Sequence, residues 1–268
     1  MCGLFGQISK VNIDKNKFLQ LVEHSEQRGV DSSGLIYYDK SLYKIERADF
    51  NIEKLLSKVK PFSSKIVMGH SRLITNGLGD NQPVVRGNIC AIHNGIIVNE
   101  AEVWKKLSVK RQLKIDSEVI VAIAEEHFLK NEKLSELPNK IMSLCRGVVA
   151  CALIFPEKGK LVLFSNNGSL YTGKINNDVY FASENYALSQ IGCSKIKQIK
   201  GEACFIDIPQ SDESFLINDT SMRKENLIPE FSFNARQEKL LEYKIDLNIK
   251  RCSRCILPET MPYIKFDK

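Results

Sequence analysis

Residues 1–6 read Met-Cys-Gly-Leu-Phe-Gly, and this apolar run bears most directly on the fold because it places Cys2 just ahead of a predicted first strand. Cysteine is small enough for the initiator methionine to be trimmed, which would leave a thiol and a free α-amine on one residue. The amine titrates near about 7.7–8.0 and a free thiol near about 8.5, so the amine can accept the thiol proton at neutral pH. Cys2 is therefore a candidate nucleophile that carries its own base. The alternative is that Cys2 is a small apolar residue in a buried strand.

The composition is that of a globular protein. The chain has 268 residues, of which 43% are hydrophobic, enough for one large domain or two small ones. It contains no run of about 18 apolar residues, and its N-terminus lacks a basic segment followed by an apolar one. We therefore expect no membrane span, no secretory signal and a cytoplasmic location.

Cysteine placement and charge distribution restrict the function further. The eight cysteines mostly stand singly inside apolar runs, as Cys151 and Cys204 do, which is typical of reduced core thiols and not of a disulfide framework. The net charge of +6 comes from dispersed lysines and arginines without interleaved aromatic residues. We expect no specific nucleic-acid partner.

Short apolar runs bounded by Gly, Asn, Asp or Lys predict strands. These runs are 3–8, 33–38, 65–70, 88–93, 147–155, 160–165, 178–183 and 203–208. Helices are predicted over 15–27, 99–108, 117–129 and 184–191. Because strands and helices do not alternate regularly, the order favours a layered α+β fold over a doubly wound parallel sheet. The Asn166-Asn167-Gly168 turn predicts an antiparallel hairpin between strand 160–165 and the next strand.

The character of the chain changes beyond about residue 210, where a polar, charged stretch replaces the strand pattern. A helix is predicted near 234–249, followed by a Cys-Ser-Arg-Cys segment. We expect a main domain over 2–215, a linker or helical extension over 216–250 and a separate C-terminal segment over 251–268.

Four segments place polar residues at the end of a predicted strand or in the turn after it. They are 27–34 (QRGVDSSG), 69–77 (GHSRLITNG), 92–99 (IHNGIIVN) and 115–120 (IDSEVI). Glycine beside a polar residue lets a ligand approach the backbone and exposes an N–H group. Singly, each segment has an ordinary explanation. Asn94-Gly95 would be a turn, Arg72 a solvated side chain and Asp116 a helix N-cap.

Together with Cys2, the order and spacing of these segments over residues 2 to about 120 resemble the class II glutamine amidotransferases, whose glutaminase domain belongs to the N-terminal nucleophile hydrolases. The resemblance is closest to the glutaminase domains of asparagine synthetase and glucosamine-6-phosphate synthase. It implies a four-layer αββα sandwich of antiparallel sheets, here with a C-terminal extension, and L-glutamine as the substrate.

The resemblance also implies a role for each matching residue. Cys2 would attack the side-chain amide of glutamine and form a γ-glutamyl thioester, while Asn94 and Gly95 donate to the oxyanion. Arg72 would hold the α-carboxylate, which a guanidinium suits better than lysine does. Asp116 would hold the α-ammonium group.

Other residues near these positions complete the implied pocket. Its lining would include Thr75, Asn76 and Gly77. Arg28 would help to order the site around Cys2, although Val30 stands where the family usually has Pro or Tyr. The residues 96–99 replace a Glu and an aromatic that are common in the family, so the contacts of those side chains cannot be transferred. We expect His93 to pack and to form hydrogen bonds, because the α-amine already serves as the base.

Cys252 and Cys255 form a CxxC pair that is half of a zinc site, a redox pair or a chance pairing. The surrounding residues 251–267 resemble the opening of the N-acetyl sugar amidotransferase family, which are enzymes of the ATP-pyrophosphatase type. No phosphate loop of the SGGxDS type occurs in these 268 residues. We therefore expect no cofactor on this chain apart from a candidate zinc ion at the CxxC pair, and we expect ATP and Mg²⁺ on a synthetase partner.

The sequence thus predicts a glutamine-hydrolysing subunit or domain that delivers ammonia to an ATP-dependent synthetase domain or subunit, with an acceptor such as a surface-sugar precursor. One alternative is an ammonia donor of the asparagine synthetase kind, with an amino-acid acceptor. A free-standing amidohydrolase or peptidase is disfavoured, because Arg72 and Asp116 would clamp both ends of a free amino acid. A catalytically silent regulatory or zinc-assembly module is the remaining alternative.

Overall fold

The computed structural model describes residues 2–73, 80–211, 215–218, 250–253 and 257. The chain divides into two compact units, Met1–Glu225 and Asn226–Lys268. In the second unit the backbone N–H of Cys252 donates to the carbonyl of Leu257 at 2.9 Å. The helix predicted near 234–249 lies outside the described residues, as does most of the linker predicted over 216–250, so the domain boundaries stay a prediction.

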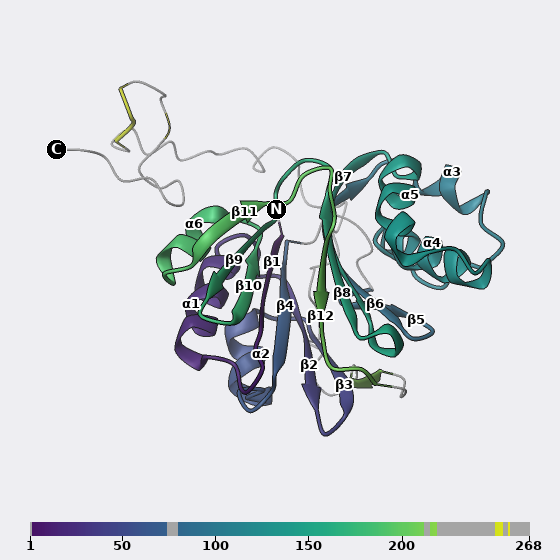
Figure 1. The fold of residues 1–268 in the computed structure, drawn as a ribbon. Coiled ribbons are helices and arrows are strands. Elements are labelled where there is room, and N and C mark those ends of the chain that lie inside the picture. The colour runs from purple at the N-terminus through teal and green to yellow at the C-terminus, as the bar shows by residue number, and fades with distance from the viewer. Residues whose placement is uncertain (1, 74–79, 212–214, 219–249, 254–256, 258–268) are drawn as a thin grey trace, which may run out of the picture. The chain divides into compact units, whose positions relative to one another are not determined.

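Two β-sheets form the middle of the first unit (Figure 1). The larger sheet contains β1 (Gly3–Ile8), β2 (Ser32–Asp39), β3 (Leu42–Ala48), β4 (Ile66–Arg72), β9 (Tyr171–Ile175), β10 (Asp178–Ala182), β11 (Ser194–Gln198) and β13 (Leu216–Asn218). The smaller sheet contains β5 (Val84–Arg86), β6 (Ile89–Ile97), β7 (Gly147–Phe155), β8 (Lys160–Ser165) and β12 (Cys204–Asp207). The strand orders are β11-β9-β10-β1-β4-β2-β3-β13 and β12-β8-β7-β6-β5. Within these sheets only the β13–β3 pair, among the described residues, is parallel.

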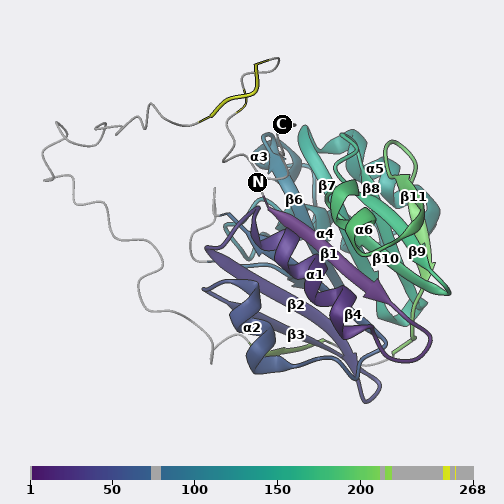
Figure 2. The same cartoon turned by 90° about the vertical axis from the view of Figure 1, so that its left-hand side faces the viewer.

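Helices cover the outer face of each sheet. Three pack on the larger sheet, namely α1 (Lys15–Glu26), α2 (Ile52–Val59) and α6 (Asn185–Gln190). Three pack on the smaller sheet, namely α3 (Glu100–Trp104), α4 (Glu118–Leu129) and α5 (Leu137–Leu144). Figure 2 shows α1 and α2 lying across the larger sheet. The arrangement confirms the expected αββα layers. No helix in the described part of the chain is long and apolar enough to span a membrane.

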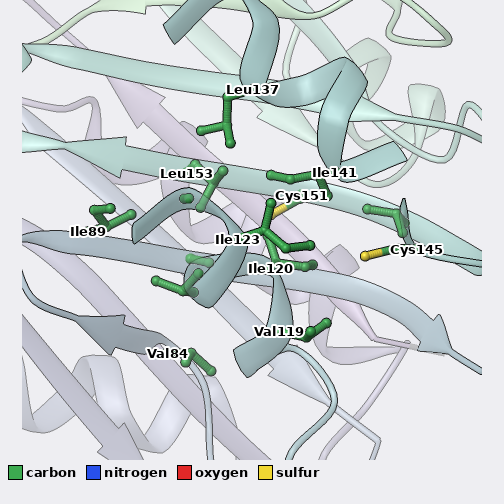
Figure 3. Packing of buried hydrophobic residues seen from close by; sticks show 14 of the residues in the cluster. Val84, Ile89, Val119, Ile120, Ile123, Leu137, Ile141, Cys145, Cys151 and Leu153 are labelled. Carbon is green, nitrogen blue, oxygen red and sulfur yellow. The ribbon is translucent and has the colours of Figure 1, made fainter. Parts of the chain in front are cut away.

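Three apolar clusters hold the layers together. In one, Ile120 and Ile123 of α4 meet Cys151 and Leu153 of β7 (Figure 3). A second joins α1, α2 and α6 to the larger sheet. The third lies between the two sheets and includes Ile92. Because successive side chains of a strand point to opposite faces, β6 alternates between the inter-sheet cluster and the layer beneath α4.

The predicted strands and the helices α1, α4 and α6 are confirmed, and the helix predicted over 99–108 is the shorter α3. The helices α2 and α5 and the short strands β3, β5, β9, β11 and β13 were not predicted. The hairpin predicted after β8 is wrong. Both edges of β8 are occupied by β7 and β12, so the chain crosses to the larger sheet, where β9 pairs with β10 and β11. Asn166 forms no hairpin turn. Its side chain instead accepts from Val149 N at 3.0 Å and donates to Gly147 O at 2.8 Å.

Candidate functional site

Cys2 lies at the start of β1, at the end of the larger sheet. Since Gly3 is paired with Ser71, Cys2 falls opposite Arg72 at the end of β4. Its Sγ atom is 3.6 Å from the carbonyl oxygen of Leu73. Burial raises the pKa of the Cys2 thiol, and the positive charges of Arg72 and Arg28 act in the opposite direction. A thiol with a raised pKa needs a base to become a nucleophile at neutral pH.

Arg28 is bonded to the chain beside Cys2. Its Nε atom donates to the carbonyl of Cys2 at 2.8 Å, and its Nη1 atom is ion-paired with Glu184. The backbone N–H of Asp31 donates to the carbonyl of Arg72 at 3.1 Å. The loop after α1 is therefore attached both to Cys2 and to the end of β4.

Arg72 is buried, and its Nη1 atom donates to the backbone carbonyl of Asp80. Burial lowers the pKa of the Arg72 guanidinium, while the neighbouring Cys2, Asp116 and Asp80 act to raise it. Arg72 is thus within electrostatic reach of both Cys2 and Asp116. The other predicted lining residues, Thr75, Asn76 and Gly77, lie outside the described residues.

Asn94 lies on β6, on the face directed toward the larger sheet. It follows Ile92 of the inter-sheet cluster by two residues, and residues two apart in a strand share a face. Asn94 is only 5% exposed. Its side-chain amide forms no hydrogen bond with any residue of the described ranges. The amide is therefore available to a ligand.

Position 95 has no room for a side chain. Its φ of +150° lies in a region that favours glycine, and a Cβ atom there would stand 1.8 Å from the carbonyl oxygen of Val148. Asn94 and Gly95 are paired with Ala150 and Val149 of β7. The backbone of β6 is thus held close to β7 at this point, and the strand continues through Gly95 without a turn. The ordinary explanation of Asn94-Gly95 as a turn is wrong.

Asp116 does not cap α4, whose N-cap residue is Ser117. The Oδ2 atom of Asp116 instead accepts from the backbone N–H of Ile97 at 2.8 Å, and Ser117 Oγ lies 3.4 Å from Oδ1. The carboxylate is buried and attached to β6, two residues beyond Gly95. The structure therefore places Asp116 beside the strand that carries Asn94 and Gly95.

A buried polar network lies behind these residues. His93 Nε2 donates to the carbonyl of Val148 at 3.1 Å, and Ser117 Oγ lies 2.9 Å from Nδ1. Burial lowers the pKa of His93, which keeps the ring neutral. Gln82 and His70 both donate to the carbonyl of His93, at 2.9 and 3.1 Å. Gln82 lies outside every segment that the sequence singled out, whereas His70 and Ser117 lie within two of those segments, 69–77 and 115–120, without having been given a role.

One surface pocket lies away from the predicted site residues that the structure describes. A pocket of about 420 Å³ is lined by residues of the β5–β6 turn, the C-terminal half of α4 and 155–158. None of the predicted site residues lines this pocket. Its Arg86 and Glu125 are ion-paired with each other, and its Asn88 donates to Glu157. The charged and amide groups named here are thus bonded to one another and not directed at a ligand.

Metal binding is not indicated in the described residues. No group of three His, Cys, Asp or Glu side chains within these ranges is arranged to hold a metal ion. Cys255 lies outside the described residues, so the predicted CxxC site is not tested.

Comparison with known proteins agrees with this geometry. Residues 70–190, which include Arg72, Asn94, Gly95 and Asp116, match the model of the glutamine amidotransferase domain. Residues 70–190 are therefore similar to a glutamine amidotransferase domain. The chain is 25% identical over 197 residues to glutamine–fructose-6-phosphate aminotransferase of Rhizobium meliloti, covering 70% of this chain and 32% of that protein. The Campylobacter jejuni protein of the same name is 31% identical over 194 residues, covering 68% and 32%.

The fold is shared with solved structures. The glutamine phosphoribosylpyrophosphate amidotransferase of B. subtilis, complexed with ADP and GMP, superimposes with a TM-score of 0.65 at 19% identity, covering 77% of this chain and 47% of that one. A second structure, titled as the allosteric regulatory enzyme of purine biosynthesis, gives a TM-score of 0.62 at 20% identity. The arrangement of two sheets between layers of helices is shared with these structures. The chain spans about a third of the length of the aminotransferases that it matches.

Proposed function

We propose that this amidotransferase domain hydrolyses L-glutamine to glutamate through a γ-glutamyl thioester on Cys2, and that the ammonia released is used by an ATP-dependent synthetase domain or subunit. One observation carries the proposal. Cys2 lies opposite Arg72 at the end of the larger sheet, the charges of Cys2 and Asp116 both act on Arg72, and Asp116 is bonded to the N–H of Ile97 on the strand that carries Asn94 and Gly95.

These residues supply what amide hydrolysis needs. After removal of Met1, the α-amine of Cys2 takes the thiol proton, directly or through a water molecule, and the thiolate adds to the side-chain carbonyl carbon of glutamine. Asn94 Nδ2 and the N–H of Gly95 stabilise the negative oxygen of the tetrahedral intermediate. Collapse of this intermediate breaks the C–N bond, and the amine returns the proton to the departing ammonia. Water then hydrolyses the thioester to glutamate and regenerates the thiol.

Arg72 and Asp116 would select a free amino acid. A buried guanidinium suits the α-carboxylate, and a buried carboxylate suits the α-ammonium group. Both side chains also have protein partners, the carbonyl of Asp80 and the N–H of Ile97. Such partners fix the orientation of each charged group before glutamine arrives, which lowers the cost of binding.

The acceptor is proposed as a carbohydrate. Two kinds of observation favour it. The relatives reported above are named for the amination of a sugar phosphate, and residues 251–267 resemble the opening of an N-acetyl sugar amidotransferase. An amino-acid acceptor, as in asparagine synthetase, is the alternative. Incubation with ATP, Mg²⁺, the proposed synthetase domain or subunit and each acceptor class distinguishes the two.

Glutamate release by the purified 268-residue chain tests the proposal. Wild type should turn over glutamine, and Cys2→Ala should abolish turnover while leaving the circular dichroism spectrum and the unfolding midpoint unchanged. Intact mass should show that Met1 is absent, and insertion of a lysine between Met1 and Cys2 should abolish turnover because the amine then belongs to another residue. Turnover retained by Cys2→Ala would overturn the mechanism, and an inactive, folded wild type would favour the silent regulatory module.

Variants of Arg72 and Asp116 test the clamp. Arg72→Gln and Asp116→Asn should raise KM for glutamine at least about tenfold, because a charge-assisted hydrogen bond contributes about 1.5–3 kcal/mol. An unchanged KM in both variants would show that the two residues do not bind the ends of glutamine.

A further inference from the structure

The open edge of β6 has a regular pattern of backbone partners. In an antiparallel ladder, every second residue directs its N–H and C=O toward the same edge. On the edge away from β7, Ala91 is paired with Val84 of β5, and the N–H of Ile97 donates to Asp116. His93 and Gly95 lie between them, beyond the end of β5.

Gln82 takes the place of a strand neighbour for His93. Its Oε1 atom accepts from the N–H of His93 at 2.6 Å, and its Nε2 atom donates to the carbonyl of His93 at 2.9 Å. Gln82 is 3% exposed, and its own N–H donates to Asn81 Oδ1 at 2.8 Å. A buried side-chain amide held at both ends thus continues the ladder that β5 begins.

The N–H of Gly95 is left between two occupied positions. His93 on one side is bonded to Gln82, and Ile97 on the other is bonded to Asp116. Among the described residues, none accepts a hydrogen bond from the N–H of Gly95. This open N–H lies next to the side-chain amide of Asn94. Because the N–H groups of His93 and Ile97 on the same edge already have partners, the N–H of Gly95 is the one that can donate to an oxyanion.

Gln82 also connects β6 to the start of α4. Its Nε2 atom lies 3.3 Å from Ser117 Oγ, which in turn lies 2.9 Å from His93 Nδ1. Ser117 follows Asp116 directly. One side chain therefore contacts both the strand of the oxyanion donors and the residue beside the ammonium clamp.

We propose that Gln82 is a positioning residue for glutamine hydrolysis, which fixes the direction of the Gly95 N–H and the Asn94 side chain and couples them to Asp116. This role rests on the proposed function. Without Gln82, the N–H of His93 loses its buried partner and the carbonyl of His93 keeps only His70, so β6 must shift to satisfy the N–H. A displacement of about 1 Å at a reacting group can lower a rate about 100-fold, and loss of one whole oxyanion donor costs about 100- to 1,000-fold in kcat.

The test compares Gln82→Met with Ser64→Ala in the full chain. Methionine has a similar length but cannot form either hydrogen bond. Ser64 is a matched control, since it is 4% exposed and its Oγ atom both accepts from the N–H of Tyr38 at 3.0 Å and donates to the carbonyl of Tyr38 at 2.6 Å. Tyr38 lies at the end of β2 opposite to Ser32, which pairs with Arg72. Ser64→Ala thus removes a similar pair of side-chain-to-backbone hydrogen bonds at a position far from the site.

We expect Gln82→Met to lower kcat by about 10- to 100-fold and to raise KM for glutamine. The rate of Cys2 alkylation by iodoacetamide, followed by peptide mass spectrometry, should stay within about twofold of wild type, because this reaction does not use the oxyanion donors. Ser64→Ala should lower the unfolding midpoint and leave kcat and KM unchanged. The role of Gln82 is overturned if Gln82→Met keeps wild-type kcat and KM, or if both variants lose activity equally. A wild type without turnover overturns the proposed function itself.

Discussion

At Gly29 the backbone comes closer to another segment than a side chain would allow. A Cβ atom there would lie 2.4 Å from both the carbonyl carbon of Arg72 and the nitrogen of Leu73. Neither atom is free to move, because the carbonyl of Arg72 accepts from Asp31 and the carbonyl of Leu73 contacts the Cys2 sulfur. A single missing methyl group therefore lets the Arg28 loop lie against the end of β4.

Gly29→Ala should lower kcat/KM about tenfold or more, because the clash moves Arg28 or Arg72 by a sizeable fraction of an ångström. The overpacking should cost about 1–3 kcal/mol in the free energy of unfolding. Steady-state kinetics and urea unfolding measure the two effects. Gly201→Ala is the control, since its φ is +78° but a Cβ atom added there would meet no heavy atom within 4 Å. It should lose stability only. Normal kinetics in Gly29→Ala would show that the close approach has no catalytic consequence.

Among the elements, β6 and α4 were predictable because their apolar residues recur at a period that matches their structure. The family resemblance assigned Asp116 to the same glutamine pocket as Asn94, without placing it in the fold. The hydrogen bond from the N–H of Ile97 to Asp116 could not be predicted, since the order Asp-Ser before a helix is equally typical of an N-cap. Gln82 could not be found either, because its two hydrogen bonds depend on where β5 ends in space. The local sequence pattern therefore predicts helices and strands. The side chains that bond to the edge of a strand are brought there only when the sheet has formed.

The start of α4 is anchored to β5 by a buried ion pair. Arg86 Nη1 donates to Glu118 Oε1 at 2.5 Å, and both side chains are almost fully buried. Glu118 also accepts from the backbone N–H of Leu113 at 2.7 Å. Because Glu118 follows Asp116 by two residues, this pair helps to fix the helix terminus from which the clamp extends.

Removal of one partner of this pair should be more harmful than removal of both. Arg86→Leu should lower the free energy of unfolding by about 3–5 kcal/mol, because the buried Glu118 carboxylate loses its charged partner. Glu118→Leu should cost less, because Arg86 keeps its ion pair with Glu125. The double variant should lose clearly less than the sum, and each single variant should raise KM for glutamine. Urea unfolding of the four proteins gives the coupling energy. The exposed pair Arg146–Glu102 serves as the comparison, with an expected coupling below about 1 kcal/mol. Equal coupling in the two cycles would contradict the anchoring role.

At the scale of the whole molecule, the two sheets are joined near the site by polar contacts in addition to apolar packing. His70 of β4 donates from Nε2 to the carbonyl of His93 on β6 at 3.1 Å. Both rings are buried. Burial lowers the pKa of His70 to about 3 and also lowers that of His93. The junction between the sheets therefore requires neutral histidines.

This requirement gives the stability a definite pH dependence. A histidine in the unfolded chain has a pKa of about 6.5, so below that pH the unfolded state binds a proton that the folded state excludes. The free energy of unfolding should then fall with decreasing pH, from about 6.5 downward, by up to about 1.4 kcal/mol per pH unit for each such histidine. His70→Gln should lose the share due to His70, so its stability should fall less steeply between about pH 6.5 and pH 4.5, while above about pH 7.5 the two proteins should show parallel curves. Urea unfolding at each pH measures both slopes. If the difference between wild type and His70→Gln stayed constant down to pH 4.5, His70 would have to be protonated in the folded protein, and the neutral junction between the sheets would be disproved.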